Sequence, residues 1–478
     1  MVSLEKYVLQ EEFASFINGQ QVAKSSGEPI EQVSPLTKKM WKTVLPAGVG
    51  ETGFAVSSAQ QAFKQWSKTP SPLRAKVLRD IANLLMEHKE LLANTITLEM
   101  GKPIKESHAE IVYSASYFSW FAGEAERIYG TSIPSQFPNK SLKIIHEPVG
   151  VCGFITPWNF PIAMPARKVA AALAAGCTTI IKPSPETPIS MFLLAKICQI
   201  AGVPDGSVNV VVGPEKEIGN IFLDSPVVRK ISFTGSTQVG MYLYRRSADT
   251  MKKLTLELGG HAPLIVFDDA SIEKAIEGTI IAKFRNTGQT CVCANRIFVQ
   301  EGIYDQFLEA FVSAVERLKV GDPLDENTDL SIFIHESAQV KVKDHVEDAL
   351  VKGAEAVLMS EQPYEPKILT GINPSMKIFT EETFGPVAPI MKFCSVDEGI
   401  TLANASEFGL ASYVFTNSME CANTAVSRLE YGIIGVNDGL VSTAQASFGG
   451  MKNSGLGREG GPTGIDEYLL EKYVSIAF

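Results

Sequence analysis

Two cysteines that lie one residue apart, Cys291 and Cys293, are the residues of this 478-residue chain that most directly suggest covalent chemistry. A helix-like apolar run, 276–284, leads into them, and a strand-like run, 296–300, leads out. A cysteine at such a junction can meet the positive end of a helix, which favours the thiolate. Because a thiolate adds readily to a carbonyl carbon, Cys291 is a candidate nucleophile for acyl or aldehyde chemistry. The alternative is a buried, inert cysteine, but Gly288 favours the nucleophile because it lets the backbone approach a ligand closely.

Two other polar side chains at the ends of strand-like runs could assist such a nucleophile. Asn159 follows the apolar run 149–155, and its amide could donate a hydrogen bond to a developing oxyanion or cap the next helix. Glu257 lies in an apolar run before two glycines, where burial would raise the pKa of the carboxyl, as a general base working near neutral pH requires. The alternative for Glu257 is a strand-end carboxylate that is paired with a lysine or solvated.

Two further segments are candidates for holding a nucleotide. The segment 180–188 contains Lys182, which could reach a ribose or a phosphate. The segment 233–237 ends a strand and opens a helix, whose free N–H groups and dipole can hold a pyrophosphate. Neither segment contains the GxGxxG pattern, so a capped turn is the alternative for the second of them.

A regular alternation of strands and helices must position these residues. Short apolar strands that alternate with helices predict a doubly wound parallel sheet, in which ligands bind at the carboxyl ends of the strands. We expect strands at 149–155, 177–182, 208–212 and 230–233, separated by helices at 161–175, 189–201 and 236–247. A second series follows, with strands at 263–267, 297–300, 387–393, 411–415 and 433–437.

The length of the chain predicts more than one hydrophobic core, with a boundary near residue 255. Helical patterns fill residues 51–127, and a polar turn within 130–147 predicts an antiparallel hairpin. The tail, 464–478, could form an edge strand that pairs with another subunit, or it could be a frayed terminus.

Composition restricts the partners and the compartment. A net charge of −10 argues against nucleic acid or an anionic membrane surface as a partner, and no apolar stretch approaches the ~18 residues of a membrane span. The first residues lack the basic and apolar pattern of a secretory signal. Seven cysteines without a disulfide-like pattern favour a reducing cytoplasm. Six scattered histidines and the lack of CxxC or HExxH spacing lead us to expect no metal site.

Seven short motifs, spread in order over nearly the whole chain, resemble those of the NAD(P)-dependent aldehyde dehydrogenase superfamily. They are Pro-Trp-Asn-Phe-Pro at 157–161, Lys-Pro-Ser at 182–184, Phe-Thr-Gly-Ser at 233–236, Leu-Glu-Leu-Gly-Gly at 256–260, Gly-Gln-Thr-Cys at 288–291, Glu-Glu-Thr-Phe-Gly-Pro at 381–386 and Phe-Gly-Gly at 448–450. The stretch 283–296, with its Cys-Val-Cys, is most similar to the succinate-semialdehyde dehydrogenase branch.

This resemblance implies roles for the residues in these motifs. Cys291 would attack an aldehyde to give a thiohemiacetal, Asn159 would stabilise the oxyanion, and hydride transfer to NAD or NADP would leave a thioester that Glu257 hydrolyses with water. Glu382 would hold the nicotinamide ribose, with Phe384 packed nearby. The other residues implied to bind the cofactor are Thr156, Trp158, Lys182, Ser184, Pro185, Gly235 and Ser236.

Two arginines that converge on this site suggest the substrate. Arg285 lies six residues before Cys291, and Arg167 lies in the helix after Asn159. Together they would form a basic pocket in an acidic protein, suited to a carboxylate at the far end of a short aldehyde. In the similar branch, arginines at the matching positions and a serine matching Ser442 bind the substrate carboxylate. The alternative is that each arginine pairs with a local acid.

The resemblance also implies the architecture and leaves several questions open. We expect two doubly wound domains, a cofactor-binding domain of residues 1–123 and 146–254 and a catalytic domain of residues 255–443. A small β element of residues 124–145 and 464–478 would bridge the subunits of a homodimer or homotetramer. Pro185 replaces the glutamate of many NAD-preferring relatives, which leaves the choice between NAD and NADP open.

Other readings of the site also stand at this point. Cys293 is a candidate for redox regulation through a disulfide with Cys291, although neutral packing is the alternative. Succinate semialdehyde is the expected substrate, and glutarate semialdehyde is the rival within the class. A cysteine-dependent ester or thioester hydrolase is the rival from another class.

Overall fold

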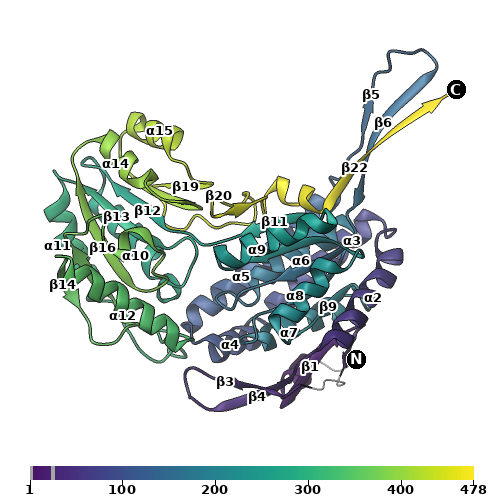
Figure 1. Ribbon diagram of the computed structural model, residues 1–478, viewed down its shortest axis with the longest axis horizontal. Coiled ribbons are helices and arrows are strands. Elements are labelled where there is room, and N and C mark those ends of the chain that lie inside the picture. Colours follow the sequence, from purple (N-terminus) through teal and green to yellow (C-terminus); the bar gives the residue numbers. More distant parts are fainter. Residues whose placement is uncertain (1–3, 23–26) are drawn as a thin grey trace.

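Two large sheets and a small projecting sheet form the protein, as the computed structural model shows for residues 4–22 and 27–478 (Figure 1). The first sheet contains five adjacent parallel strands in the order β11-β10-β7-β8-β9. Their bounds are β7 (Val151–Ile155), β8 (Thr178–Lys182), β9 (Val208–Val210), β10 (Val228–Thr234) and β11 (Lys253–Glu257). The helices between them are α6 (Ala163–Ala175), α7 (Pro188–Ile200), α8 (Glu215–Asp224) and α9 (Thr237–Ser247), with a short turn η1 (Ala248–Thr250).

The strand order of this sheet determines where a ligand can bind. From β7 the chain proceeds through β8 to β9 on one side, and β10 and β11 lie on the other side. Neighbouring strands β7 and β10 therefore mark the topological switch point, where doubly wound sheets bind ligands outside the carboxyl ends of their strands. The segments that carry Asn159 and Ser236 follow these two strands directly.

The N-terminal quarter extends this sheet and covers it with helices. The sheet gains four strands and is preceded by a short helix: α1 (Leu4–Val8), β1 (Glu12–Ile17), β2 (Gln20–Val22), β3 (Ile30–Val33) and β4 (Met40–Leu45). The expected helical region consists of α2 (Val49–Trp66), α3 (Ser71–Glu87), α4 (Lys89–Met100) and α5 (Ile104–Ala125). Left-handed Gly101, at φ +81°, ends α4, as is common at helix ends because glycine tolerates positive φ.

The second sheet is also mainly parallel and confirms the expected second α/β series. Its order is β14-β15-β16-β13-β12-β18-β19, with β12 (Ala262–Val266), β13 (Ala294–Gln300), β14 (Glu355–Met359), β15 (Lys367–Thr370), β16 (Val387–Phe393), β18 (Ala411–Phe415) and β19 (Ile433–Val436). The helices are α10 (Ile272–Phe284), α11 (Tyr304–Val315), α12 (Glu336–Val351), α13 (Lys377–Thr380), α14 (Val396–Asn404) and α15 (Met419–Arg428). Short elements complete this part: η2 (Arg285–Gly288), β17 (Phe408–Gly409) and β20 (Met451–Lys452). Strand β21 (Gly455–Leu456) instead pairs antiparallel with β11 at the edge of the first sheet.

The third sheet projects away from the body and carries the C-terminus near its tip (Figure 1). It consists of β5 (Thr131–Ile133), β6 (Lys140–Pro148) and β22 (Leu469–Ala477), which follows two short turns, η3 (Pro462–Gly464) and η4 (Asp466–Tyr468). β6 pairs antiparallel with β5, as expected for the hairpin, and with all of β22 on its other side. The tail is therefore a paired edge strand rather than a frayed terminus.

The predicted boundary near residue 255 falls inside β11, which belongs to the first sheet up to Glu257. No helix in the described part of the chain is both long and apolar enough to cross a membrane.

Candidate active site

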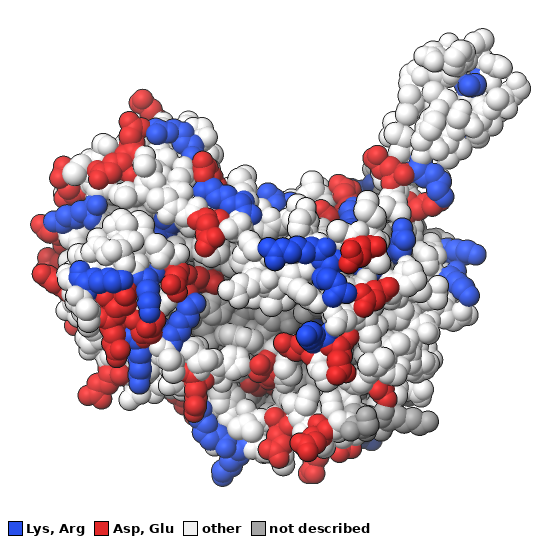
Figure 2. Space-filling model, viewed as in Figure 1, with Lys and Arg blue, Asp and Glu red and all other residues white. Residues whose placement is uncertain are grey.

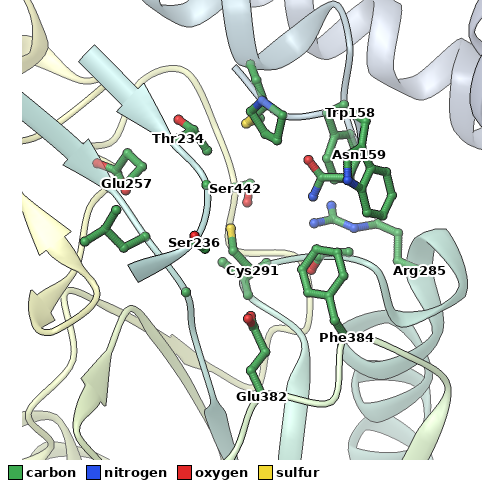
Figure 3. A pocket seen from close by; sticks show the side chains of 18 of the residues that line it. Trp158, Asn159, Thr234, Ser236, Glu257, Arg285, Cys291, Glu382, Phe384 and Ser442 are labelled. Atoms are coloured by element: carbon green, nitrogen blue, oxygen red, sulfur yellow. The ribbon is translucent and has the colours of Figure 1, made fainter. Parts of the chain in front are cut away.

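The first and second sheets, each with its helices, form two lobes. A cavity of about 750 Å³ lies between these lobes, and both contribute side chains to its wall. A hollow between the lobes is visible on the surface in Figure 2. Cys291 lies in the middle of the close view in Figure 3, with Glu257 on one side and Asn159 and Arg285 on the other. Seven more of the expected site residues line the same cavity: Trp158, Arg167, Gly235, Ser236, Glu382, Phe384 and Ser442. Lys182 and Ser184 do not line it.

Unusual backbone conformations precede Cys291 and determine its position. Asn286, Thr287 and Gly288, between α10 and Cys291, have φ values of +52°, +56° and +76°. A Cβ on Gly288 would lie 2.4 Å from the Gly385 carbonyl oxygen, so the turn requires glycine there. The Thr287 hydroxyl and the backbone of Ser331 exchange two hydrogen bonds of 3.1 Å, which hold the strained turn.

The helix that leads into Cys291 does not activate its thiol, and this corrects our expectation. Cys291 follows the carboxyl end of α10 and the turn η2, so the positive end of this helix does not face it. Burial raises the pKa of the Cys291 thiol to about 12, and the charges of Arg167 and Arg285 lower it only in part. The thiol therefore needs a base to accept its proton before it can attack.

Asn159 does not cap the helix that follows it. Its Nδ2 donates to the Gln289 carbonyl at 3.1 Å. The first backbone N–H groups of the next helix, those of Ile162 and Ala163, donate instead to Glu110 at 2.9 and 3.0 Å. The side-chain amide of Asn159 therefore faces the cysteine loop, and Glu110 supplies the cap that the alternative assigned to Asn159.

Glu257 is a buried carboxyl without a hydrogen-bond partner. Its side chain is 2% exposed, and neither of its oxygens has a hydrogen-bond partner among the described residues. Burial and the nearby Glu459 carboxylate raise the pKa of Glu257 well above its usual value. This is the direction expected for a general base, and it differs from a solvated or lysine-paired glutamate.

The two arginines have different surroundings. The guanidinium of Arg167 forms a buried ion pair with Glu459 and lies 4.4 Å from the centre of the Phe448 ring. Arg167 thus has the local acid that the alternative reading foresaw. Arg285 has no ion pair or hydrogen bond among the described residues, and its guanidinium points into the cavity (Figure 3). An unpaired cation facing a cavity is suited to an anionic ligand.

The expected cofactor residues divide into two groups. The first group lines the cavity: the amino end of α9 with Gly235 and Ser236, and an aromatic cluster in which Trp158 contacts Phe384 at 5.8 Å between ring centres. Glu382 also lines it, and its Oε1 accepts a hydrogen bond from the Gly260 backbone at 3.1 Å.

The second group lies beyond the cavity, around the carboxyl ends of β7 and β8. Lys182 forms a 2.5 Å ion pair with Glu215. The Ser184 hydroxyl donates to Glu186, and the Pro185 carbonyl accepts from Gln32 at 3.0 Å. The Thr156 backbone N–H donates to the Lys182 carbonyl at 3.1 Å, which joins the two strand ends.

Cys293 is separated from the cavity. It is 1% exposed, and its Sγ donates to the Lys283 carbonyl at 3.3 Å and accepts from the Lys283 ammonium at 3.3 Å. These contacts hold its thiol in place, so a disulfide with Cys291 would require them to break.

Several residues of the site were not anticipated from the sequence. From α5 come Glu106, Glu110 and Tyr113, and from the end of the chain comes Glu459, which pairs with Arg167. Glutamates on an amphipathic helix usually indicate a solvated face, and Glu459 lies in a loop without a motif of its own. The spacing of 106, 110 and 113 does place these three on one helix face, which is a signal only once the cavity is known.

Comparisons with known proteins support a common architecture and chemistry. The model of the aldehyde dehydrogenase family matches residues 22–474. A mitochondrial succinate-semialdehyde dehydrogenase of Arabidopsis thaliana is 47% identical, with 96% of this chain and 88% of the relative covered. A succinate-semialdehyde dehydrogenase of Escherichia coli, named with NADP(+), and a glutarate-semialdehyde dehydrogenase of Pseudomonas putida are each 45% identical, with 97% of both chains covered. A solved succinate-semialdehyde dehydrogenase from Burkholderia pseudomallei superposes with a TM-score of 0.96 at 45% identity, and 99% of each chain is covered.

Proposed function

Because this chain belongs to the aldehyde dehydrogenase family, we propose that it oxidises a short aldehyde with a carboxylate at its far end, and that succinate semialdehyde is this substrate. One observation carries the proposal: the unpaired guanidinium of Arg285 faces the same cavity as Cys291. A cation that forms no ion pair and faces a cavity can bind an anion there, and the substrate tail supplies one. The names of the Arabidopsis thaliana and Escherichia coli relatives agree with this choice.

The proposed mechanism assigns one task to each residue around the cysteine. Cys291 loses its proton and attacks the aldehyde carbon, which gives a thiohemiacetal. Asn159 Nδ2, together with the Cys291 backbone N–H, donates hydrogen bonds to the oxyanion. After oxidation to a thioester, Glu257 takes a proton from water, which then hydrolyses the thioester to the carboxylate product. Arg285 and Ser442 orient the substrate tail, and Arg167 acts mainly through its ion pair with Glu459.

The cavity fits a nicotinamide coenzyme. The amino end of α9 presents Gly235 and Ser236 to the cavity, where helix N–H groups can hold a pyrophosphate. Glu382 keeps one oxygen, Oε2, for a ribose hydroxyl because the Gly260 N–H occupies Oε1. We assign Trp158, Phe384, Thr156, Lys182, Ser184 and Pro185 to the rest of this site. NAD or NADP, when bound there, accepts the hydride that leaves the substrate.

A second substrate also has support. The Pseudomonas putida relative is named for glutarate semialdehyde, which is one methylene longer than succinate semialdehyde. A single methylene changes binding by only about 1–3 kcal/mol, so relative kcat/KM across chain lengths decides between the two aldehydes.

The direct test follows coenzyme reduction by absorbance. The purified protein is incubated with succinate semialdehyde and either NAD or NADP, and we expect turnover with at least one of them. Arg285→Ala should raise KM for the semialdehyde by about tenfold to a hundredfold, as the loss of a charge-assisted pair worth about 1.5–3 kcal/mol implies. KM for butyraldehyde, which lacks the carboxylate, should not change. Ester cleavage without coenzyme reduction would favour the hydrolase instead.

We also propose a homodimer or homotetramer in a reducing compartment such as the cytoplasm. On the face seen in Figure 2 the projecting sheet shows few charged side chains, whereas the body is densely charged. β22 keeps one edge unpaired in the described structure, and this edge is available to a second copy of the chain. All seven cysteines are free, as is usual in a reducing compartment.

A further inference from the structure

The acidic side chain of Glu106 lies next to Arg285, the residue proposed to bind the substrate carboxylate. Glu106, in the first turn of α5, lines the same cavity as Arg285. Its Oε2 accepts a hydrogen bond of 2.7 Å from the backbone N–H of Asn286, the residue after Arg285. This bond holds the carboxyl against the arginine's own segment. The described residues give its other oxygen, Oε1, no hydrogen-bond partner.

Three positively charged side chains near Glu106 come from three different segments of the chain. Among the described residues, Arg285 is the one of these three that forms no ion pair. Lys102, in the loop before α5, is bound to Glu110 at 2.6 Å. Lys105, on α5 itself, is paired with Asp329 at 2.5 Å. Arg285, on η2, has no ion pair among the described residues, so a carboxylate that enters the cavity is drawn to it.

A substrate carboxylate at Arg285 would therefore meet a second carboxyl that competes for the same cation. Two carboxylates that share one site cannot both stay ionised without a large cost, and one of them takes up a proton. Burial already raises the pKa of Glu106 to about 7, against the opposing effects of Lys102 and Arg285. Of the two carboxyls, Glu106 is thus the one that accepts the proton more readily.

We propose that Glu106 is a specificity residue that becomes protonated from solvent when a carboxylate tail binds beside Arg285. The proposal rests on the proposed function, because it requires the tail at Arg285. The neutral carboxyl can donate its O–H from Oε1 to the tail, while Oε2 still accepts from Asn286. An uncharged aldehyde causes no such proton uptake. Glu106 thereby couples the recognition of anionic substrates to pH.

Butyrate is a suitable probe because it has the chain and the carboxylate but no aldehyde to react with Cys291. Glu106 is neutral at low pH and ionised at high pH, so the inhibition constant of butyrate should rise as pH increases. We expect a rise of about tenfold between about pH 6 and about pH 8.5, equivalent to a pKa displacement of about one unit. Calorimetry in buffers of different ionisation enthalpy should show uptake of about half a proton per site at about pH 7.5, midway between the pKa values of Glu106 in the free protein and in the complex.

Glu106→Gln keeps an acceptor for the Asn286 N–H but cannot titrate, so it should flatten the pH dependence and abolish the proton uptake. Glu106→Asp should keep both the pH dependence and the proton uptake. Glu309 is an exposed glutamate on α11, and Glu309→Gln is the matched control. If this variant does not fold, the wild-type calorimetry decides, because butyrate binding at about pH 8 without proton uptake overturns the proposal.

Arg285→Ala separates this inference from the proposed function. Unchanged inhibition by butyrate in Arg285→Ala would overturn the carboxylate pocket itself. Weakened inhibition in Arg285→Ala, with a wild-type pH dependence in Glu106→Gln, would overturn only the role of Glu106.

Discussion

At the scale of single residues, burial favours the protonated form of both the proposed nucleophile and the proposed base. Burial raises the pKa of Cys291 to about 12 and that of Glu257 well above its usual value. When Glu257 is ionised, its carboxylate is one of the charges that raise the pKa of Cys291. The site therefore gains activity when a proton leaves it, and we expect the rate to increase with pH.

Glu257→Gln should separate the two halves of the reaction. Gln cannot take the proton of the hydrolytic water, so we expect the first turnover to give about one equivalent of reduced coenzyme per site. Steady-state kcat should then fall by about 10²–10⁴-fold, the usual contribution of a general base. The increase of kcat with pH should also disappear, because a group whose pKa is raised works as a base only above that pKa.

Rapid-mixing absorbance measures both the first turnover and the later rate. Glu277→Gln, an exposed glutamate on α10, is the control and should behave as the wild type. Sustained turnover of Glu257→Gln at the wild-type rate would show that another group activates the water.

The chemistry of these residues was easier to predict than their surroundings. Asn159 and Glu257 were identified at the ends of predicted strands, Cys291 at a junction between a helix and a strand, and Arg285 from its spacing to Cys291. The structure brings all four to one cavity. The prediction of a lowered pKa for Cys291 was wrong, because this pKa depends on burial by distant segments rather than on the nearest helix. An acidic partner for Arg167 was one of the alternatives, but Glu459 could not be identified as that partner because it lies 292 positions away in the sequence.

At the scale of elements, the loop before α5 braces the segment that carries Asn159. The Lys102 ammonium is fully buried, and it donates to the Asn159 carbonyl at 2.8 Å and to Glu110 at 2.6 Å. Glu110 in turn accepts from the first N–H groups of α6. One ammonium and one carboxylate thus fix both the carbonyl beside the oxyanion donor and the start of the following helix.

Lys102→Met should disturb this brace. The substitution keeps the length of the side chain but leaves the buried Glu110 without its ion-pair partner, which costs about 3–5 kcal/mol of unfolding free energy. We expect a large decrease of kcat and little change of KM for the semialdehyde, because in the proposed mechanism Asn159 acts in the transition state whereas Arg285 binds the tail. Chemical denaturation and steady-state kinetics measure the two effects.

Lys105→Met is the matched control because its ion pair with Asp329 is about one-third exposed on both sides. Exposed pairs contribute at most about 1 kcal/mol, so both readouts should change little. An equal loss of kcat in Lys102→Met and Lys105→Met would show that the brace has no special role.

The helices and strands were predictable where the spacing of apolar residues and the positions of glycine or proline indicated the same boundaries. The alternation of apolar strands with helices correctly indicated strands β7, β8, β10, β12, β16 and β18 and helices α6, α7 and α9. Helix α8 was not anticipated because only four of its residues are buried, so its apolar pattern is short. Strand β14 was also not anticipated, since it is an exposed edge strand that shows no buried face.

At the scale of the whole molecule, the projecting sheet has little of its own to stabilise it. It consists of three strands and has no helix packed on it (Figure 1), although small sheets need a covered apolar face. Large apolar side chains of β22 and the terminus are exposed: Leu470 by 45%, Tyr473 by 62%, Ile476 by 40% and Phe478 by 86%. A second copy of the chain that covers this sheet would bury them.

Ile476→Lys combined with Phe478→Lys should therefore weaken the oligomer without unfolding the subunit. Both side chains lie on one face of the strand because alternate residues share a face. Substitutions of exposed residues usually change stability by no more than about 0.5 kcal/mol, whereas two charges in an apolar interface would each need a partner. Sedimentation at several concentrations should show a smaller mass for this variant than for the wild type. Val340→Lys combined with Val351→Lys, which are 65% and 88% exposed on α12, is the matched control and should keep the wild-type mass. Equal masses for all three proteins would place the subunit contact elsewhere on the molecule.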